Sequence, residues 1–188
     1  FVETLASLVE AGVIDRAGNI NSESPSDRVR TVDENLEFVL VWADNSGTDN
    51  DIALRQSEID NLIRAKAAVY AGVVTLLNQL GLGTEMIEHL YLAGAFGEHL
   101  DIEAAVKIGL LPDMPADRVN VAGNTALMGA YIALLSSEAR EKVKEVAGAA
   151  TYVDLSSSND FMEEFVSAQM MPHTDMERFP SVVNSIGE

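Results

Sequence analysis

The sequence contains no cysteine, so these residues can form no disulfide and can supply no thiolate ligand to zinc or to an iron–sulfur cluster. With no disulfide framework and nothing that resembles a signal peptide, we expect a cytoplasmic location. Long hydrophobic runs are also missing: none approaches the roughly 18 apolar residues of a membrane-spanning helix. The composition therefore argues against a disulfide-rich secreted scaffold and against a membrane partner.

Basic residues are scarce, since 12 Lys and Arg stand against 30 Asp and Glu, for a net charge of −18. General binding to DNA or RNA needs a basic face to neutralise phosphates, so we expect no nucleic-acid partner. The acidity either keeps the protein soluble or recognises a basic partner, and solubility is the simpler interpretation.

The 188 residues are enough for one domain with a proper core, and an apolar content of 47% is typical of a globular protein. The chain opens with Phe1 and not with Met, inside an amphipathic helical pattern. We therefore expect it to be a piece of a longer protein.

Two strand–turn–helix units form the centre of the sequence, at residues 87–108 and 119–135. In each unit a β-prone run (87–93 and 119–122) ends at small, glycine-bearing residues, and a helical run follows. The turn residues are Gly94, Ala95, Phe96 and Gly97 in the first unit and Gly123, Asn124 and Thr125 in the second.

Two such units in tandem predict a parallel α/β sheet with ligands at the carboxyl ends of its strands. Glycine permits backbone angles that other residues resist and lets a bound group approach the main chain, while the start of a helix suits an anion. The simpler alternative is that each turn only joins a strand to a helix. In that case Asp101 caps one helix, and Asn124 or Thr125 caps the other.

The strongest helical pattern spans residues 56–81, where Ser57 and Asp60 resemble a capping box. Lys66 falls inside the apolar stripe of this helix. A cation at such a position must extend to solvent, pair with a carboxylate or meet a ligand. The first two interpretations are favoured over the third.

Other segments are predicted from periodicity and from turn residues. They are a helix over 1–11 ended by Gly12, hairpin strands over 36–43 and 51–55, a helix over 137–146, a strand over 151–155, a helix over 159–171 stopped by Pro172, and a tail over 173–188 without a period that wraps the surface or frays.

Several kinds of catalytic site find no support in the sequence. The histidines (His89, His99 and His173) are scattered, no Gly-x-Ser-x-Gly elbow is present, and His99 beside two carboxylates is a weak basis for a metal site, so we expect none. The Walker phosphate loop and the dinucleotide fingerprint are absent too. What remains is a nucleotide-sized site on small-residue turns.

Three long runs carry a resemblance to a known family: LIRAKAAVYAGVVTLL, YLAGAFGEHLDIEAAVKIGLLP and VAGNTALMGAYIALLS. With AGVIDRAGNI and YVDLSSSNDFMEEFVSAQMMPHTD, they resemble the C-terminal domain of the reductive activators of corrinoid proteins. That family is similar to the actin, sugar-kinase and heat-shock-chaperone ATPases. The resemblance implies an α/β fold with a ribonuclease-H-like lobe, a mixed sheet flanked by helices, over residues 1–172 and a tail over 173–188.

The resemblance also implies a nucleotide site. Residues 92–97 would form the adenosine-binding turn, and Gly123, Asn124 and Thr125 would close the same cleft, with Lys66 on the helix that leads into it. The phosphate loops, the acid that holds Mg²⁺ with ATP, and the catalytic residues would lie upstream of Phe1, as would a ferredoxin-type [2Fe–2S] domain.

The implied activity is ATP-dependent electron transfer that restores Co(II) corrinoid to Co(I) on a methyltransferase component. The corrinoid protein and ATP would be the partners, a homodimer is compatible with the pattern, and the chain alone would be inactive. Two alternatives stay open because fold does not fix function: a phosphotransferase of the acetate- or sugar-kinase kind, and a non-catalytic docking or dimerisation domain.

Overall fold

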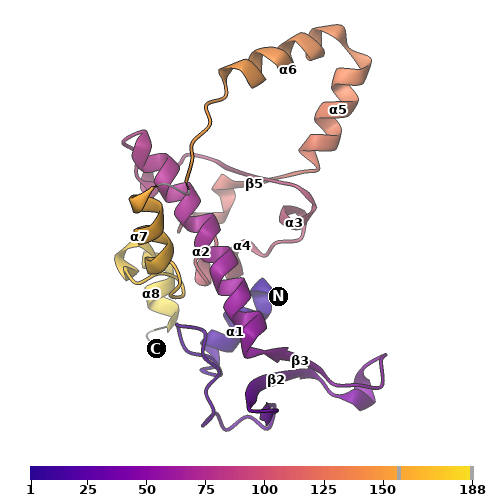
Figure 1. Cartoon of the computed structure of the whole chain (residues 1–188), viewed down its shortest axis with the longest axis vertical. Coiled ribbons are helices and arrows are strands. Elements are labelled where there is room, and N and C mark those ends of the chain that lie inside the picture. The colour runs from indigo at the N-terminus through magenta and orange to yellow at the C-terminus, as the bar shows by residue number, and fades with distance from the viewer. Residues whose placement is uncertain (156–157, 187–188) are drawn as a thin grey trace.

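The structure is a computed structural model that describes residues 1–155 and 158–186. Its helices are α1 (Val2–Glu10), α2 (Gln56–Gln79), α3 (Ala95–Glu98), α4 (Ile102–Lys107), α5 (Thr125–Leu135), α6 (Ser137–Ala149), α7 (Asn159–Ser167) and α8 (Pro180–Ile186). Its strands are β1 (Val29–Val32), β2 (Asn35–Val41), β3 (Ile52–Arg55), β4 (Leu90–Ala93) and β5 (Val119–Gly123). Helix α2 crosses the middle of the molecule, with β2 and β3 at one end, while α5 and α6 form a hairpin that extends away from the rest (Figure 1).

Strands β1, β2 and β3 form an antiparallel sheet, which confirms the predicted hairpin. In the centre, Phe38 of β2 pairs with Val29 on one side and with Leu54 on the other. On the polar side, Arg30 contacts Glu37 at 2.8 Å and Asp51 at 2.6 Å. These ion pairs join β1 to β2 and to the start of β3.

Helix α2 confirms the predicted long helix, but it begins differently. Strand β3 runs directly into the helix, so Arg55 is the N-cap residue and its N–H donates to Glu58 Oε2 at 2.9 Å. The capping box expected from Ser57 and Asp60 is therefore wrong, because Ser57 already lies in the first helical turn.

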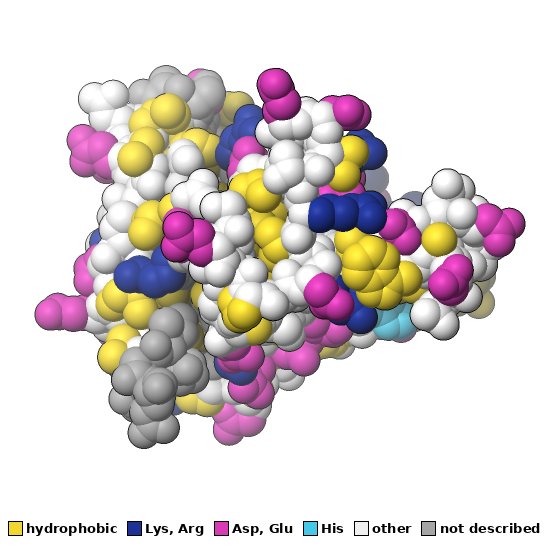
Figure 2. Space-filling view, turned by 90° about the horizontal axis from the view of Figure 1, so that it is seen from below, with side chains coloured by type: hydrophobic (Ala, Val, Ile, Leu, Met, Phe, Trp, Pro, Cys, Tyr) yellow, Lys and Arg dark blue, Asp and Glu magenta, His cyan; other side chains and the backbone are white. Residues whose placement is uncertain are grey.

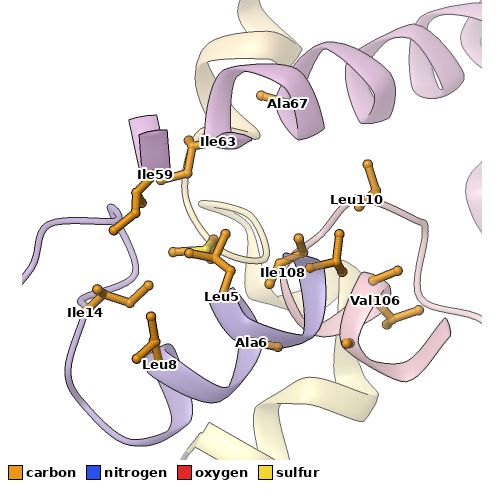
Figure 3. Close-up of a cluster of buried hydrophobic side chains, with 14 of the residues drawn as sticks. Leu5, Ala6, Leu8, Ile14, Ile59, Ile63, Ala67, Val106, Ile108 and Leu110 are labelled. Atoms are coloured by element: carbon orange, nitrogen blue, oxygen red, sulfur yellow. The ribbon is translucent and has the colours of Figure 1, made fainter. Parts of the chain in front are cut away.

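The hydrophobic core gathers side chains from α1, from α2 and from the end of α4. Figure 3 shows Leu5 of α1 among Ile63 of α2 and Ile108, which follows α4, and all three are buried. Each such side chain stabilises the fold by about 1.5–3 kcal/mol relative to an exposed one. Helix α1 ends as predicted, with Gly12 at φ +66.

The C-terminal segment differs most from expectation. Helix α7 ends at Ser167, four residues before the predicted end. The tail does not wrap the surface, because His173, Phe179 and Val182 are buried, and Val182 lies in α8. The predicted strand over 151–155 is also wrong, since these residues adopt no strand and Tyr152 is 87% exposed. A β-prone run becomes a strand only where a neighbouring edge pairs with it.

Gly109 allows the tail to reach the core. It has φ +75, and a Cβ at this position would clash with the carbonyl group of Pro172. A larger residue would therefore be strained and would also push the tail away from the end of α4.

The two predicted strand–turn–helix units are present, and their strands β4 and β5 pair in parallel. The α/β class is confirmed. The antiparallel and parallel pairings lie in two separate sheets among the described residues, with helices beside both.

Acidic side chains are spread over the face seen in Figure 2 and are interspersed with Lys and Arg. A net charge of −18 distributed in this way fits the solubility interpretation better than a single acidic docking patch on that face. Within residues 1–155 and 158–186, no helix is both long enough and apolar enough to cross a membrane.

Candidate functional site

The two predicted turns lie side by side in the structure. Strands β4 and β5 run parallel, so their carboxyl ends meet at the same edge of the sheet, and Ala93 pairs with Gly123 there. The N–H of Gly94 donates to the carbonyl oxygen of Gly123 at 2.7 Å. Turns separated by about thirty residues in the sequence thus form one continuous backbone surface, at the position where open α/β sheets bind ligands.

Glycine is required at positions 94 and 123 because of the backbone angles there, and not because a larger side chain would clash with its neighbours. Gly94 has φ +97 and ψ +163, and Gly123 has φ +64. A Cβ built on either residue meets no heavy atom within 4 Å. Both positions are therefore open, and a flat group could lie directly against the main chain there.

Gly97 has a different role from its neighbours. It is buried, and a Cβ on it would lie 3.0 Å from the Cβ of Leu92. This glycine lets α3 pack tightly on β4, so it positions the turn and is not an approach point for a ligand. Between the two glycines, Ala95 is exposed and Phe96 is 70% exposed, so an apolar ring stands at the surface of the turn.

The polar residues of the second turn begin α5. The Oδ1 atom of Asn124 accepts a hydrogen bond from the N–H of Leu127 at 3.0 Å, so Asn124 is the N-cap and Thr125 is the first helical residue. Asp101 caps α4 in the same way, with Ala104 as donor at 2.9 Å. The capping expectation is confirmed for Asp101 and Asn124. Asn124 and Thr125 are both exposed beside Gly123.

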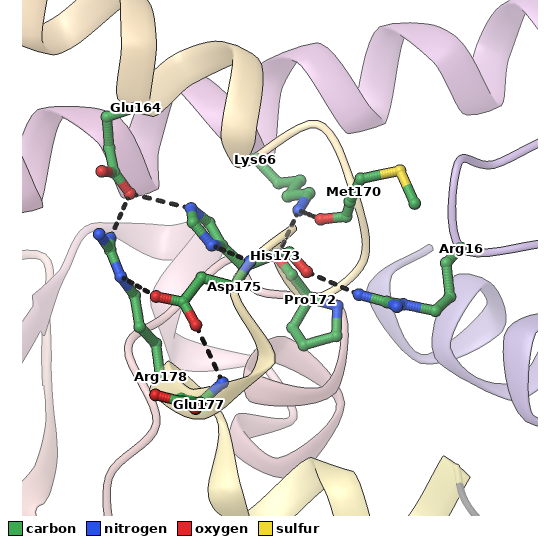
Figure 4. Close-up of polar contacts among 9 residues, drawn as sticks. All are labelled: Arg16, Lys66, Glu164, Met170, Pro172, His173, Asp175, Glu177 and Arg178. Carbon is green, nitrogen blue, oxygen red and sulfur yellow. Dashed lines mark hydrogen bonds and ion pairs between the residues drawn. The ribbon is translucent and has the colours of Figure 1, made fainter.

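Lys66 does not join the two turns. Its side chain is completely buried, and Nζ donates to the carbonyl oxygens of Met170 at 2.6 Å and Pro172 at 2.9 Å (Figure 4). The side chain does not extend to solvent and pairs with no carboxylate of residues 1–155 and 158–186, so both favoured interpretations of this lysine are wrong. Burial, with a smaller contribution from the charge of Arg16, lowers the pKa of Lys66 to about 7.

A second cation holds the same segment from the other side. Arg16 donates through Nε to the carbonyl oxygen of Met171 at 2.8 Å and through Nη2 to that of His173 at 2.6 Å. Lys66 and Arg16 together satisfy four consecutive carbonyl groups, from Met170 to His173. The position of Lys66 in an apolar stripe is visible in the sequence, but no sequence pattern indicates its carbonyl partners.

His173 and Glu164 complete the cluster. The N–H of Asp175 donates to His173 Nδ1 at 2.9 Å, so the ring carries its proton on Nε2, which lies 3.0 Å from Glu164 Oε1. Arg178 donates to the same carboxylate oxygen at 2.7 Å. Burial acts to raise the pKa of Glu164, but the hydrogen bonds from His173 and Arg178 outweigh it and lower that pKa. The cluster is structural, since it fixes the tail against α7 and α2.

The described residues contain no group of three or more His, Asp or Glu side chains arranged to hold a metal ion. His89 and His99 are exposed and lie outside the cluster around His173.

Comparison with known proteins shows to which family the chain that carries the adjacent turns belongs. A family model described as "C-terminal domain of RACo the ASKHA domain" matches residues 1–183. The chain belongs to this family. A solved structure, "Reductive activator for corrinoid,iron-sulfur protein", is 48% identical and superposes with a TM-score of 0.90 over 96% of this chain and 29% of its own.

Curated relatives of the family agree with this assignment. The "Corrinoid activation enzyme RamQ" of Eubacterium limosum is 31% identical over 176 residues, which are 90% of this chain and 30% of that protein. The "[Co(II) methylated amine-specific corrinoid protein] reductase" of Methanosarcina barkeri is 29% identical over 96 residues, 51% of this chain and 18% of that protein. The chain thus spans less than a third of the length of these relatives.

These matches confirm the family resemblance and the actin-like ATPase class of fold. They name no residue of this chain as a ligand of a nucleotide. The nucleotide site therefore stays a prediction. Its residues at the two turns are Gly94, Ala95, Phe96, Gly97, Gly123, Asn124 and Thr125.

Proposed function

We propose that this chain is the ATP-binding part of a reductive activator that restores Co(II) corrinoid to Co(I) on a corrinoid-dependent methyltransferase component. Two lines of support are the family match over residues 1–183 and relatives whose names describe corrinoid activation or reduction. The structural observation that carries the proposal is the direct hydrogen bond between the two glycine turns at the carboxyl ends of β4 and β5.

The turns fit the adenosine end of ATP. Gly94 and Gly123 present backbone without a Cβ in the way, so a purine ring and ribose could approach both. Phe96 offers an exposed aromatic ring at the rim, while Asn124 and Thr125 offer polar groups beside Gly123. Backbone for a flat ring and a few polar groups for orientation are what a nucleoside pocket needs.

The phosphates and Mg²⁺ require other groups. Lys66 cannot reach them in this conformation because it is fully buried and bonded to Met170 and Pro172. We propose that the residues that hold Mg²⁺ and the phosphates, and the catalytic residues, come from the part of the longer protein that precedes residue 1.

The chain has no cysteine, so it supplies no thiolate ligand to an iron–sulfur cluster. In the proposed activator a ferredoxin-type [2Fe–2S] centre elsewhere in the polypeptide delivers one electron to Co(II). ATP can assist this unfavourable transfer only if it binds one conformation or one complex more tightly than another. We propose that closure on ATP changes the affinity for the corrinoid protein, and that the two turns form one side of the closing cleft.

The test is a titration of the full-length activator with its corrinoid protein in the presence of ATP, of ADP and of no nucleotide. We expect the dissociation constant to differ at least tenfold between the ATP and nucleotide-free titrations, which corresponds to about 1.4 kcal/mol of coupling. Equal affinity under all three conditions would remove the coupling. Failure of the protein to bind ATP at all would remove the nucleotide site as well.

A further inference from the structure

Helix α7 and the tail that follows it form a C-terminal unit (residues 158–186) with contacts of its own. Glu164 of α7 lies 3.0 Å from His173 and 2.7 Å from Arg178, so the helix and the tail hold each other. The segment that leads into the unit, residues 150–155, forms no helix or strand and is drawn as a coil between α6 and α7 in Figure 1. The C-terminal unit can therefore separate from α2 without breaking a helix or a strand, as the cooperative subunits of other folds do.

Lys66 of α2 lies directly against the C-terminal unit. Its side chain is completely buried, and Nζ donates to the carbonyl oxygens of Met170 at 2.6 Å and Pro172 at 2.9 Å (Figure 4). Both partners belong to the unit, and no carboxylate within residues 1–155 and 158–186 forms an ion pair with the amine. Separation of the unit would remove both hydrogen bonds and return the amine to water.

The closed and the separated arrangements bind a proton at Lys66 with different strength. Burial without a carboxylate takes away the hydration that a charged amine needs, whereas an amine in water is protonated at neutral pH. Burial, with a smaller contribution from the charge of Arg16, lowers the pKa of Lys66 from 10.5 to about 7 in the closed arrangement. A proton that the separated arrangement keeps is therefore released on closure.

Several other charged or titratable groups surround this contact. They are Arg16 after α1, Tyr70 on α2, Glu164 on α7, and His173, Asp175 and Arg178 in the tail. Arg16 donates to carbonyl oxygens of the tail, and the carboxylate of Glu164 is compensated by Arg178. None of these groups supplies a negative charge in contact with Lys66 Nζ, so the preference of the closed arrangement for the neutral amine is not offset.

We propose that the C-terminal unit is a proton-controlled latch, which separates locally from α2 and does so more readily when Lys66 is protonated. At about pH 8, each separation takes up about one proton from solvent. Since the separated arrangement binds the proton more tightly, separation becomes about tenfold rarer for each pH unit between about pH 7 and about pH 9. Gly109 abuts the carbonyl group of Pro172, so separation also frees the end of α4, while α1 and the β2–β3 hairpin stay folded.

The first test is amide hydrogen exchange in the full-length protein, without nucleotide, under conditions in which closing is faster than exchange. The N–H of Met171, which donates to the carbonyl oxygen of Arg16 at 2.8 Å, reports on the latch. The N–H of Val39, which donates to that of Arg28 at 2.8 Å, reports on β2. After correction for the intrinsic exchange rates, the opening constant at residues 168–182 should fall about a hundredfold from about pH 7 to about pH 9, and that of β2 by less than about threefold.

Two results of this test would overturn the proposal. An opening constant at residues 168–182 that does not change with pH would show that the latch takes up no proton. An equal fall at residues 168–182 and in β2 would show that Lys66 is uncovered only when the whole molecule unfolds.

The second test repeats the measurement on two matched variants of the full-length protein. Lys66→Met removes the buried amine, and Lys142→Met removes the same charge from α6, where the side chain is 67% exposed. We expect the hundredfold fall at residues 168–182 to persist in Lys142→Met and to vanish in Lys66→Met. Both variants keep His173, so persistence of the fall in Lys66→Met would assign the proton to another group and contradict the proposal. If Lys66→Met does not fold, the wild-type comparison with β2 still decides, and neither test involves ATP or the corrinoid protein.

Discussion

At the residue scale, Lys66 combines complete burial with hydrogen bonds to uncharged partners only. Its Nζ atom contacts the carbonyl oxygens of Met170 and Pro172, and no carboxylate among the described residues forms an ion pair with it. Burial disfavours the charged form and lowers the pKa to about 7, from 10.5. A neutral amine still has two hydrogens to donate, so both hydrogen bonds survive when the proton is lost.

This pKa leads to a prediction for stability against pH. The unfolded chain binds the proton more tightly than the folded chain, so between the folded and unfolded pKa values stability rises with pH. From about pH 7 to about pH 9 we expect Lys66 to add about 1.4 kcal/mol to the free energy of unfolding per pH unit. Urea unfolding at several pH values measures this pH dependence of the free energy of unfolding.

The matched variant for this experiment is Lys66→Met, which keeps the length of the side chain but cannot titrate. The difference in unfolding free energy between wild type and variant isolates Lys66, because all other groups titrate in both. A difference that does not change with pH would show that Lys66 has an ordinary pKa in the folded protein. In the full-length protein this variant should bind ATP as tightly as wild type does, since Lys66 is not at the turns.

At the scale of secondary-structure elements, α5 depends on its first residues. The side chain of Asn124 accepts a hydrogen bond from the N–H of Leu127. No tertiary packing among the described residues buries the helix. Asn124→Ala should therefore destabilise α5 by about 1 kcal/mol, seen as faster amide exchange over residues 125–129. Asn124→Asp should restore the protection, because a carboxylate accepts the same bond and suits the helix N-terminus. Equal exchange in all three proteins would show that the cap contributes nothing.

Local sequence patterns were sufficient to predict those elements whose conformation depends mainly on neighbouring residues. The long helix α2, the β2–β3 hairpin and the two strand–turn–helix units follow from periodicity and from glycine positions. The caps at Asp101 and Asn124 follow from residue type. These features need no knowledge of distant residues.

Elements that depend on distant contacts were not predictable. Phe179 and Val182 have no helical period with the residues before them, and they are buried only because the tail meets α2 and the end of α4. The run 151–155 has strand propensity but no partner strand. For Lys66, the position in the stripe was visible in the sequence, but its carbonyl partners lie more than a hundred residues away.

At the scale of the whole molecule, two regions of opposite character lie next to each other. One is a packed core in which α1, α2, α4 and the tail fix one another through buried apolar side chains and through the carbonyl groups held by Lys66 and Arg16. The other is the β4–β5 sheet with α5 and α6, which has few buried side chains. The glycine turns lie in the second region.

Two alanine variants distinguish a nucleotide-binding role of the adjoining turns at Gly94 and Gly123, as proposed, from a purely connecting role. Gly123 (φ +64) and Gly81 (φ +69) have nearly the same backbone angle, and a Cβ on either meets no heavy atom within 4 Å. Alanine should strain both positions equally, by about 1–2 kcal/mol. Only Gly123 belongs to the turns.

The measurement is calorimetric titration of the full-length protein with ATP. We expect Gly123→Ala to weaken ATP binding at least tenfold, about 1.4 kcal/mol, while Gly81→Ala leaves it within twofold of wild type. Equal ATP affinity in wild type, Gly123→Ala and Gly81→Ala would contradict the claim and would leave the turns as connections between a strand and a helix.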